Sequence, residues 1–266
     1  MKNHSSFRKR GFTLLETVIA IGVLAVLLTG FMIVFAPAAA GIKKAISVQE
    51  ADRLASTLEQ ELVTLRKGEE PTDFLTGFDK AFNRIKNSTG PNPTGSKDTG
   101  NPDEALLVYQ YRGSLTKNRQ DGTPEPVADV RDAIPGQDYI VQTMMRTKKE
   151  SNFLKDLVAV EGGVYVVKCV QLVFEGSELQ SVDAKDTKLR GNIMNPKPKS
   201  SGSTDYQAGP FGKSEDYPEA VIAFSAEFFV LPSKSAGYFS NSSKGFKDTY
   251  TKLKKPVFTR NLAVRR

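Results

Sequence analysis

An apolar segment near the N-terminus constrains this chain more than any other feature. Thr17–Ala36 contains no charged residue, and the only charge just before it in the apolar run is Glu16. A helix that rises about 1.5 Å per residue crosses the roughly 30 Å hydrocarbon core of a bilayer with about 20 residues. We therefore predict a membrane-spanning helix over residues 12–42. The remainder of the chain would be carried by that helix.

Two observations distinguish this segment from a secretory signal peptide. The apolar core of a signal peptide is only about 7–15 residues long, which is shorter than the run found here. Glu16 is also unexpected, because an unpaired carboxylate in mid-bilayer costs roughly 2.5–3.5 kcal/mol. The sequence therefore predicts a segment that is retained and a carboxylate that acquires a partner.

The letters GFTLLE at Gly11–Glu16, followed by an apolar helix, resemble the leader of type IV pilins and type II secretion pseudopilins. The resemblance implies that a membrane-embedded aspartyl prepilin peptidase cuts between Gly11 and Phe12, and that Phe12 is then N-methylated. It further implies that Glu16 meets the N-terminal amine of a neighbouring subunit during assembly. Such pairing agrees with the rule that buried charges are tolerated when they are paired. The alternative is a plain signal anchor with an incidental glutamate.

The distribution of charge predicts the orientation of the chain. The formal net charge is +7, and four of the positive charges belong to the predicted leader, whose loss leaves +3; they are Lys2, Arg8, Lys9 and Arg10. By the positive-inside rule, these leader charges hold the N-terminus in the cytoplasm. We therefore expect a single-pass inner-membrane protein with its C-terminal domain in the periplasm. Nucleic acid is not an expected partner, since +3 is a weak positive charge.

Cysteine and histidine usage excludes several chemistries. The only cysteine is Cys169 and the only histidine is His4, which the predicted cut removes. The mature chain therefore has no internal disulfide, Cys–His pair, Ser–His–Asp triad or histidine-based metal site. We expect no enzymatic activity and no cofactor, and Cys169 is interpreted as a buried small hydrophobe. No metal site is predicted either, because the loop carboxylates lack the spacing of a regular calcium loop; they are Asp183, Asp186, Asp205, Glu215 and Asp216.

Periodicity predicts two helices before the first strand. The first runs to about Lys67, with a kink or local melting near Ala36–Gly41 because of Pro37 and Gly41. Its second half is amphipathic, with an apolar face formed by Val48, Ala51, Leu54, Ala55, Leu58, Leu62 and Leu65. Charged residues take the other faces, namely Glu50, Asp52, Arg53, Glu59, Glu61 and Arg66. A short second helix within 72–86 would bury Phe74, Phe78, Phe82 and Ile85, and residues 86–104 read as a loop.

Strand-like runs follow at 105–112, 138–147, 163–174, 219–231 and 256–264, with a brief helix at 151–160. In the fourth run one face carries Ala220, Ile222, Phe224, Ala226, Phe228 and Val230. The other face carries Ser225 and Glu227, as expected for a sheet covered mainly on one side. The predicted fold class is α+β, with a long N-terminal helix on an antiparallel sheet. The leader resemblance implies the same pilin-like fold.

We therefore predict a leader at 1–11, a membrane and assembly helix at 12–42, and a globular domain at 43–266. The expected function is that of a processed subunit of a type IV pilus or type II secretion pseudopilus. The length of the mature chain and its polar segments at 183–218 and 232–255 favour a minor, tip or priming subunit. Expected partners are prepilin peptidase, other pilin or pseudopilin subunits, the inner-membrane assembly platform and membrane lipid.

Two alternatives belong to other classes of protein. The first is a filament- or membrane-anchored adhesin whose loops contact a surface or substrate. Its only hint is a set of loop aromatics that would otherwise pin the long loops down, namely Tyr206, Phe211, Tyr217, Tyr238 and Phe239. The second, an anchored hydrolase, is disfavoured because the mature chain lacks histidine.

Overall fold

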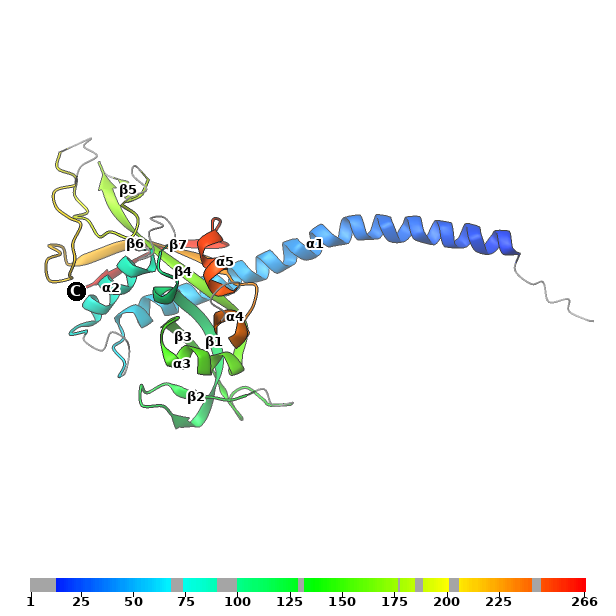
Figure 1. Ribbon diagram of the computed structural model, residues 1–266, viewed down its shortest axis with the longest axis horizontal. Helices are drawn as coiled ribbons and strands as arrows, with labels where there is room; N and C mark the ends of the chain where they lie inside the picture. The colour runs from blue at the N-terminus through cyan, green and yellow to red at the C-terminus, as the bar shows by residue number, and fades with distance from the viewer. Residues whose placement is uncertain are drawn as a thin grey trace, which may run out of the picture. The chain divides into compact units, whose positions relative to one another are not determined.

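The computed structural model describes residues 13–67, 74–89, 100–128, 132–176, 178–184, 189–200, 206–240 and 245–266. The chain divides between Ile46 and Ser47 into two compact units. Helix α1, Leu14–Val63, contributes to both of them (Figure 1). The described part of the first unit is the α1 segment that ends at Ile46, and all other elements belong to the second unit.

Helix α1 remains helical through residues 36–41, so the predicted local melting is wrong. Pro37 removes only its own backbone donor, while the alanines that follow it are the best helix formers. The helix also ends at Val63 rather than near Lys67, although the Thr64 backbone N–H still donates to the Gln60 carbonyl oxygen at 3.1 Å.

The predicted apolar face of α1 is confirmed over most of its length in the second unit. Its fully buried residues are Ala51, Leu54, Ala55, Leu58 and Leu62. Two assignments were wrong. Leu65 lies beyond the end of the helix and is 48% exposed, whereas Glu61 is buried and accepts a hydrogen bond from Arg66 Nε at 3.2 Å. The arginine satisfies the carboxylate and so permits its burial.

Helix α2, Gly77–Ser88, confirms the predicted second helix. Thr76 caps its N-terminus, where the Thr76 hydroxyl oxygen accepts from the Asp79 backbone N–H at 3.1 Å. Phe78, Phe82 and Ile85 are buried as predicted, while Phe74 precedes the helix. The predicted loop at 86–104 is only partly described: residues 86–88 belong to α2, residues 102–104 form the 3-10 turn η1, and residues 90–99 lie outside the described residues.

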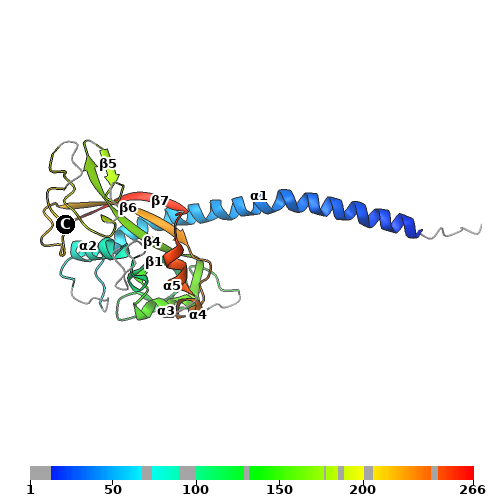
Figure 2. The ribbon, with the colours of Figure 1, turned by 45° about the horizontal axis from the view of Figure 1, so that its top comes forward.

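All five predicted strands are present, in one antiparallel sheet with two short additional strands. In chain order the strands are β1 Leu106–Asn118, β2 Pro124–Pro126, β3 Ile140–Thr147, β4 Val160–Glu175, β5 Glu178–Ser181, β6 Val221–Val230 and β7 Phe258–Arg265. The main path runs β2–β1–β4–β6–β7, while β3 pairs with β1 and β5 pairs with β4 (Figure 2). Antiparallel neighbours can be joined by short connections, as between β1 and β2 and between β4 and β5, whereas residues 231–257 connect β6 to β7.

Both faces of this sheet are covered, so the prediction of cover mainly on one side was wrong. The second half of α1 and helix α2 pack on one face, in a core that includes Leu58, Phe82 and Phe224. The opposite face is covered by four short helices, namely α3 Ser151–Asp156, the 3-10 turn η2 Leu157–Ala159, α4 Ala236–Ser240 and α5 Phe246–Lys252. The helix predicted at 151–160 is thus confirmed as α3 followed by η2.

The end of β6 shows how this second core arises. Phe229 points away from the predicted apolar face and is buried with the short helices. Val230, which was predicted to be buried, is the last residue of β6 and is 39% exposed. The predicted inward positions Ile222, Phe224 and Phe228 are fully buried.

Glu50 fastens the second half of α1 to β4 within the second unit. Its carboxylate accepts from the Gly163 backbone N–H at 3.0 Å and from the Tyr165 hydroxyl at 2.8 Å. Gly162 has φ +65°, and a Cβ at this position would lie 2.0 Å from Glu50 Oε1. Glycine is therefore required both for the backbone conformation and for the close approach of the carboxylate.

Candidate functional site

The first unit presents an apolar helical surface. From Leu14 to Ile46 every described residue is exposed, including Leu14 at 86% and Ile33 at 70%. Among the described residues, α1 is the one helix that is long and apolar enough to cross a membrane. An apolar surface of this extent marks a site of contact with lipid or protein.

Glu16 lies in the first turn of this helix and forms a reciprocal contact with Thr13. The Glu16 backbone N–H donates to the Thr13 hydroxyl oxygen at 3.2 Å, and the Thr13 backbone N–H donates to Glu16 Oε2 at 3.5 Å. This is a capping box, which satisfies two backbone donors that the start of a helix leaves without partners. The negative charge is also favourable near the positive end of the helix dipole.

The residues predicted to be recognised and cut by the peptidase lie outside the described residues. These are Arg8, Lys9, Arg10, Gly11 and Phe12. Cleavage, N-methylation and the pairing of Glu16 with a neighbouring amine therefore stay predictions. The described geometry of Glu16 adds a local role, capping, that the sequence analysis did not consider.

A family model described as the prokaryotic N-terminal methylation motif matches residues 6–32. This motif is the leader of type IV pilins and pseudopilins, so the chain carries a pilin-type leader followed by a long apolar helix. The α+β arrangement of α1 on an antiparallel sheet is consistent with a pilin-like fold. No curated protein and no solved structure matches the chain.

The motif supports a type IV pilin-like or pseudopilin-like processed subunit. It implies processing by prepilin peptidase and assembly with other pilin subunits. Together with the apolar helix, it fits membrane anchoring and pilus assembly. The family that carries this motif is structural rather than enzymatic.

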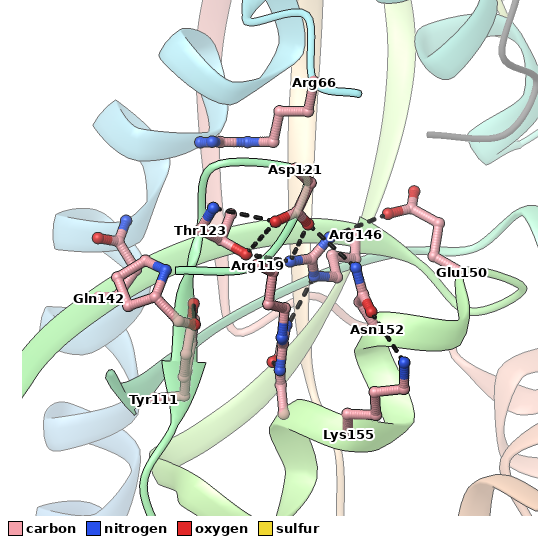
Figure 3. Close-up of polar contacts among 12 residues, drawn as sticks. Arg66, Tyr111, Arg119, Asp121, Thr123, Gln142, Arg146, Glu150, Asn152 and Lys155 are labelled. Atoms are coloured by element: carbon pink, nitrogen blue, oxygen red, sulfur yellow. Dashed lines mark hydrogen bonds and ion pairs between the residues drawn. The ribbon is translucent and has the colours of Figure 1, made fainter. Parts of the chain in front are cut away.

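The second unit contains a buried ionic network that was not predicted from the sequence. Arg146, on β3, is 2% exposed, and its Nε lies 3.0 Å from Asp156 Oδ2. Its Nη2 lies 3.0 Å from Asp121 Oδ2, and its Nη1 lies 3.5 Å from Glu150 Oε2 (Figure 3). One guanidinium thus joins the turn between β1 and β2 to β3 and α3. Its planar array of donors suits several carboxylates at once.

Further buried groups extend this network. Arg119 Nη2 lies 2.6 Å from Asp156 Oδ1, and the Tyr109 hydroxyl donates to Asp156 Oδ2 at 2.6 Å. Arg84, on α2, reaches Glu150 Oε1 at 3.0 Å. Three arginines and three carboxylates therefore lie in one connected cluster, as a buried charge requires.

The surroundings of Arg146 and Asp121 favour the charged form of each side chain. Burial alone would disfavour the Arg146 cation, but the adjacent acidic groups, with Tyr109 and Asp156 foremost, outweigh burial and raise its pKa. Burial likewise acts against the Asp121 carboxylate, but hydrogen bonds from Thr123 and the charge of Arg146 lower its pKa. Burial and the Asp156 charge raise the pKa of Tyr111 to about 12. The sequence signal for this cluster was slight, because Arg146 precedes Thr147, Lys148 and Lys149 and so resembles the other polar residues at the end of a strand.

An open polar cleft of about 640 Å³ lies against this network. It is lined by Lys67, Arg119, Gln120, Asp121, Glu125, Pro126, Ser151, Asn152 and Lys155. We call this feature the polar cleft. The residues come from the segment that follows α1, from the β1–β2 hairpin and from α3, so segments distant in sequence form a single surface.

The remaining candidates from sequence are structural where they are described. Cys169 is buried and free, and burial raises the pKa of its thiol to about 12, which makes it unreactive. Among the described residues no group of three or more His, Cys, Asp or Glu side chains is placed to hold a metal ion. Asp183 pairs with Arg190 at 3.0 Å, whereas Asp186 and Asp205 lie outside the described residues.

The loop aromatics pack inward. Tyr217 is 1% exposed and Phe239 is 3% exposed. Phe211 contacts Tyr217 edge to face at 5.7 Å between ring centroids, and Tyr238 contacts Phe239 in the same way at 5.1 Å. Tyr206 packs against a small core that includes Val173. These side chains anchor the long loops rather than present a binding surface.

Proposed function

We propose that this chain is a processed, inner-membrane-inserted pilin-like subunit, and that it serves as a minor, tip or priming component of a type IV pilus or type II secretion pseudopilus. The observation that carries the proposal is the methylation motif at residues 6–32, which overlaps the start of an exposed apolar helix. In this proposal residues 1–11 are the leader, residues 12–42 the membrane and assembly helix, and residues 43–266 the periplasmic domain. The assembly platform of the inner membrane would move the subunit from lipid into the filament.

The minor role is supported by the long polar connections of the second unit. The connection between β5 and β6 runs from residue 182 to residue 220, and its described parts pack on the sheet through Ile193, Met194 and Tyr217. A subunit that repeats along a shaft must fit copies of itself on several sides, which compact loops allow more readily. The anchored adhesin receives less support, because Tyr217 and Phe239 are buried.

Processing provides the first test. Intact-mass analysis of the protein from a host with an active prepilin peptidase should show loss of residues 1–11 and the addition of one methyl group to Phe12. Gly11→Leu should keep the leader, because a bulky side chain replaces the residue at the cut. Gly22→Ala is the matched control, since a Cβ there meets nothing within 4 Å, and it should be cut normally. An uncut wild-type chain would refute the proposal.

A further inference from the structure

Several charged side chains that line the polar cleft have no strong partner within it. Asp121 is fully engaged, because it accepts hydrogen bonds from Arg146, Thr123 and Asn152. The ammonium of Lys155 makes only a long contact, 3.4 Å, with Asn152 Oδ1. Lys67 and Glu125 are exposed and have no polar partner among the described residues. Two ammonium groups and one carboxylate are therefore available to a ligand.

The floor of the cleft is held rigidly by the ionic network. Asn152 Nδ2 donates to Asp121 Oδ2 at 3.1 Å, and Asp121 is in turn fixed by Arg146 (Figure 3). Arg119 also lines the cleft, but its guanidinium is mostly buried and its Nη2 lies 2.6 Å from Asp156 Oδ1, so it belongs to the floor and not to the groups that face a ligand. A preorganised floor lowers the entropy that a ligand loses on binding.

The lining restricts the class of ligand. None of the nine lining residues is aromatic, so the cleft offers no platform on which nucleobases would stack. Strand addition at β2 is also disfavoured, since Pro124 and Pro126 have no backbone N–H to offer a new strand. The side-chain amides of Gln120 and Asn152 can pair with peptide groups, and the lysines can pair with carboxylates.

We propose that the polar cleft binds a short acidic peptide segment of another protein, whose carboxylates contact Lys67 and Lys155. Glu125, on the opposite hairpin strand, would disfavour a ligand with uniform negative charge on that side. The site therefore favours a segment with its acidic residues at one end. The proposal goes beyond the assembly role of the apolar helix and stands without it, because every contributing residue belongs to the second unit.

The test is binding of a labelled peptide to the full chain in detergent micelles, followed by fluorescence anisotropy. The probe is a six-residue peptide with three glutamates followed by three glycines, and its comparison peptide has glutamines in place of the glutamates. The double variant Lys67→Gln/Lys155→Gln should bind the acidic peptide at least tenfold more weakly than the wild type. The double variant Lys252→Gln/Lys254→Gln removes the same charge away from the cleft and should bind within twofold of the wild type.

Several results would overturn the proposal. Equal weakening in both double variants would mean that the peptide responds to net charge rather than to the cleft. Equal binding of the glutamate and glutamine peptides would remove the role of the carboxylates. Polygalacturonate binding that is lost in the cleft variant, with no binding of the acidic peptide by the wild type, would assign the cleft to an acidic polysaccharide instead.

Discussion

Lys168 is an ionisable residue whose side chain is buried next to an aromatic ring. It lies on β4, is 5% exposed, and its Nζ is 4.6 Å from the ring centroid of Tyr250. Glu227 is its neighbour across the β4–β6 pairing, but the Glu227 carboxylate is bonded to Arg190. Burial, assisted by the Arg190 charge and opposed by Glu227, lowers the pKa of Lys168 to about 8. The aromatic face offsets part of the cost of keeping a cation there.

Titration of this side chain should contribute to the free energy of unfolding in mildly alkaline solution. The lysine pKa is 10.5 in the unfolded chain and about 8 in the folded chain, so the unfolded state binds more protons between those values. Titration of Lys168 should therefore contribute an increase in the free energy of unfolding as pH rises from about 8 to about 10, whereas the raised pKa values of Cys169 and Tyr111 act in the opposite direction. Lys168→Met should lose this contribution, and at neutral pH it should be more stable than the wild type by about 1–3 kcal/mol.

Urea unfolding followed by circular dichroism at several pH values would measure this effect. Lys197→Met is the matched control, since Lys197 has a side chain 55% exposed and should keep the wild-type slope. A Lys168→Met protein with an unchanged slope would show that another group titrates in this range.

Single residues also show where sequence reasoning loses accuracy. Leu58 and Phe224 lie in the middle of long periodic segments, and their burial was predicted correctly. Leu65 and Val230 lie at or beyond the ends of such segments. There the apolar periodicity of the sequence continues, but the side chains are no longer buried by other elements. Glu61 is buried only because Arg66 reaches back to it. No property of a single position reveals such a partner.

At the scale of elements, the junction between α1 and α2 depends on one glycine. Gly77 begins α2, and a Cβ at this position would lie 2.3 Å from the carbonyl oxygen of Val63 at the end of α1. The atom in the way belongs to the backbone, so it cannot move aside as a flexible side chain would. The close approach of the two helices therefore needs a residue without a side chain.

Gly77→Ala should destabilise the protein even though alanine is the better helix former by about 1 kcal/mol. We expect the free energy of unfolding to fall by about 1–3 kcal/mol, because the two helices must separate to admit the methyl group. Gly212→Ala is the control, since a Cβ there meets nothing within 4 Å, and it should change stability little. A stabilised Gly77→Ala protein would show that the helix ends are free to move apart.

The ionic network illustrates why elements are easier to predict than their contacts. The five long strands and the three predicted helical regions could be found because each carries its own period. Tyr109 and Asp156 are 47 positions apart, and Arg84 and Glu150 are 66 positions apart. The Tyr109–Asp156 pair depends on the antiparallel pairing of β1 with β3, and the Arg84–Glu150 pair also depends on where α2 packs. The polar cleft depends on the same pairing, so the sequence could not locate it.

At the scale of the whole molecule, the division between the two units predicts that the second folds without the first. A fragment of residues 43–266 should be a soluble monomer, because the buried face of α1 and both sheet cores lie within it. In this fragment Leu58→Ala should cost about 2–5 kcal/mol, the usual range for a truncated core leucine. Leu65→Ala, at a side chain 48% exposed, should cost less than about 0.5 kcal/mol. Equal costs for the two substitutions in urea would mean that the α1 face is not packed as described.

Glu16 lies at the start of α1, and two proposed roles of its carboxylate can be tested separately. One is helix capping and the other is subunit assembly. In the capping role, the side chain accepts a hydrogen bond from the Thr13 backbone N–H, which glutamine can also do. In the assembly role, the carboxylate pairs with the positively charged Phe12 amine of a neighbour, which requires the negative charge. A buried amine left without its partner typically costs about 3–5 kcal/mol.

We expect Glu16→Ala and Glu16→Gln to be made, inserted and cut normally, because Gly11 and the leader charges are unchanged and lipid tolerates the loss of a charge. Both variants should nevertheless fail to co-purify with partner subunits from solubilised membranes, while Glu16→Asp should retain part of the wild-type yield. Co-purification of Glu16→Gln but not Glu16→Ala would assign the residue to helix capping alone. Wild-type yield for both variants would leave α1 as a simple membrane anchor, since neither the charge nor the cap would then be needed for assembly.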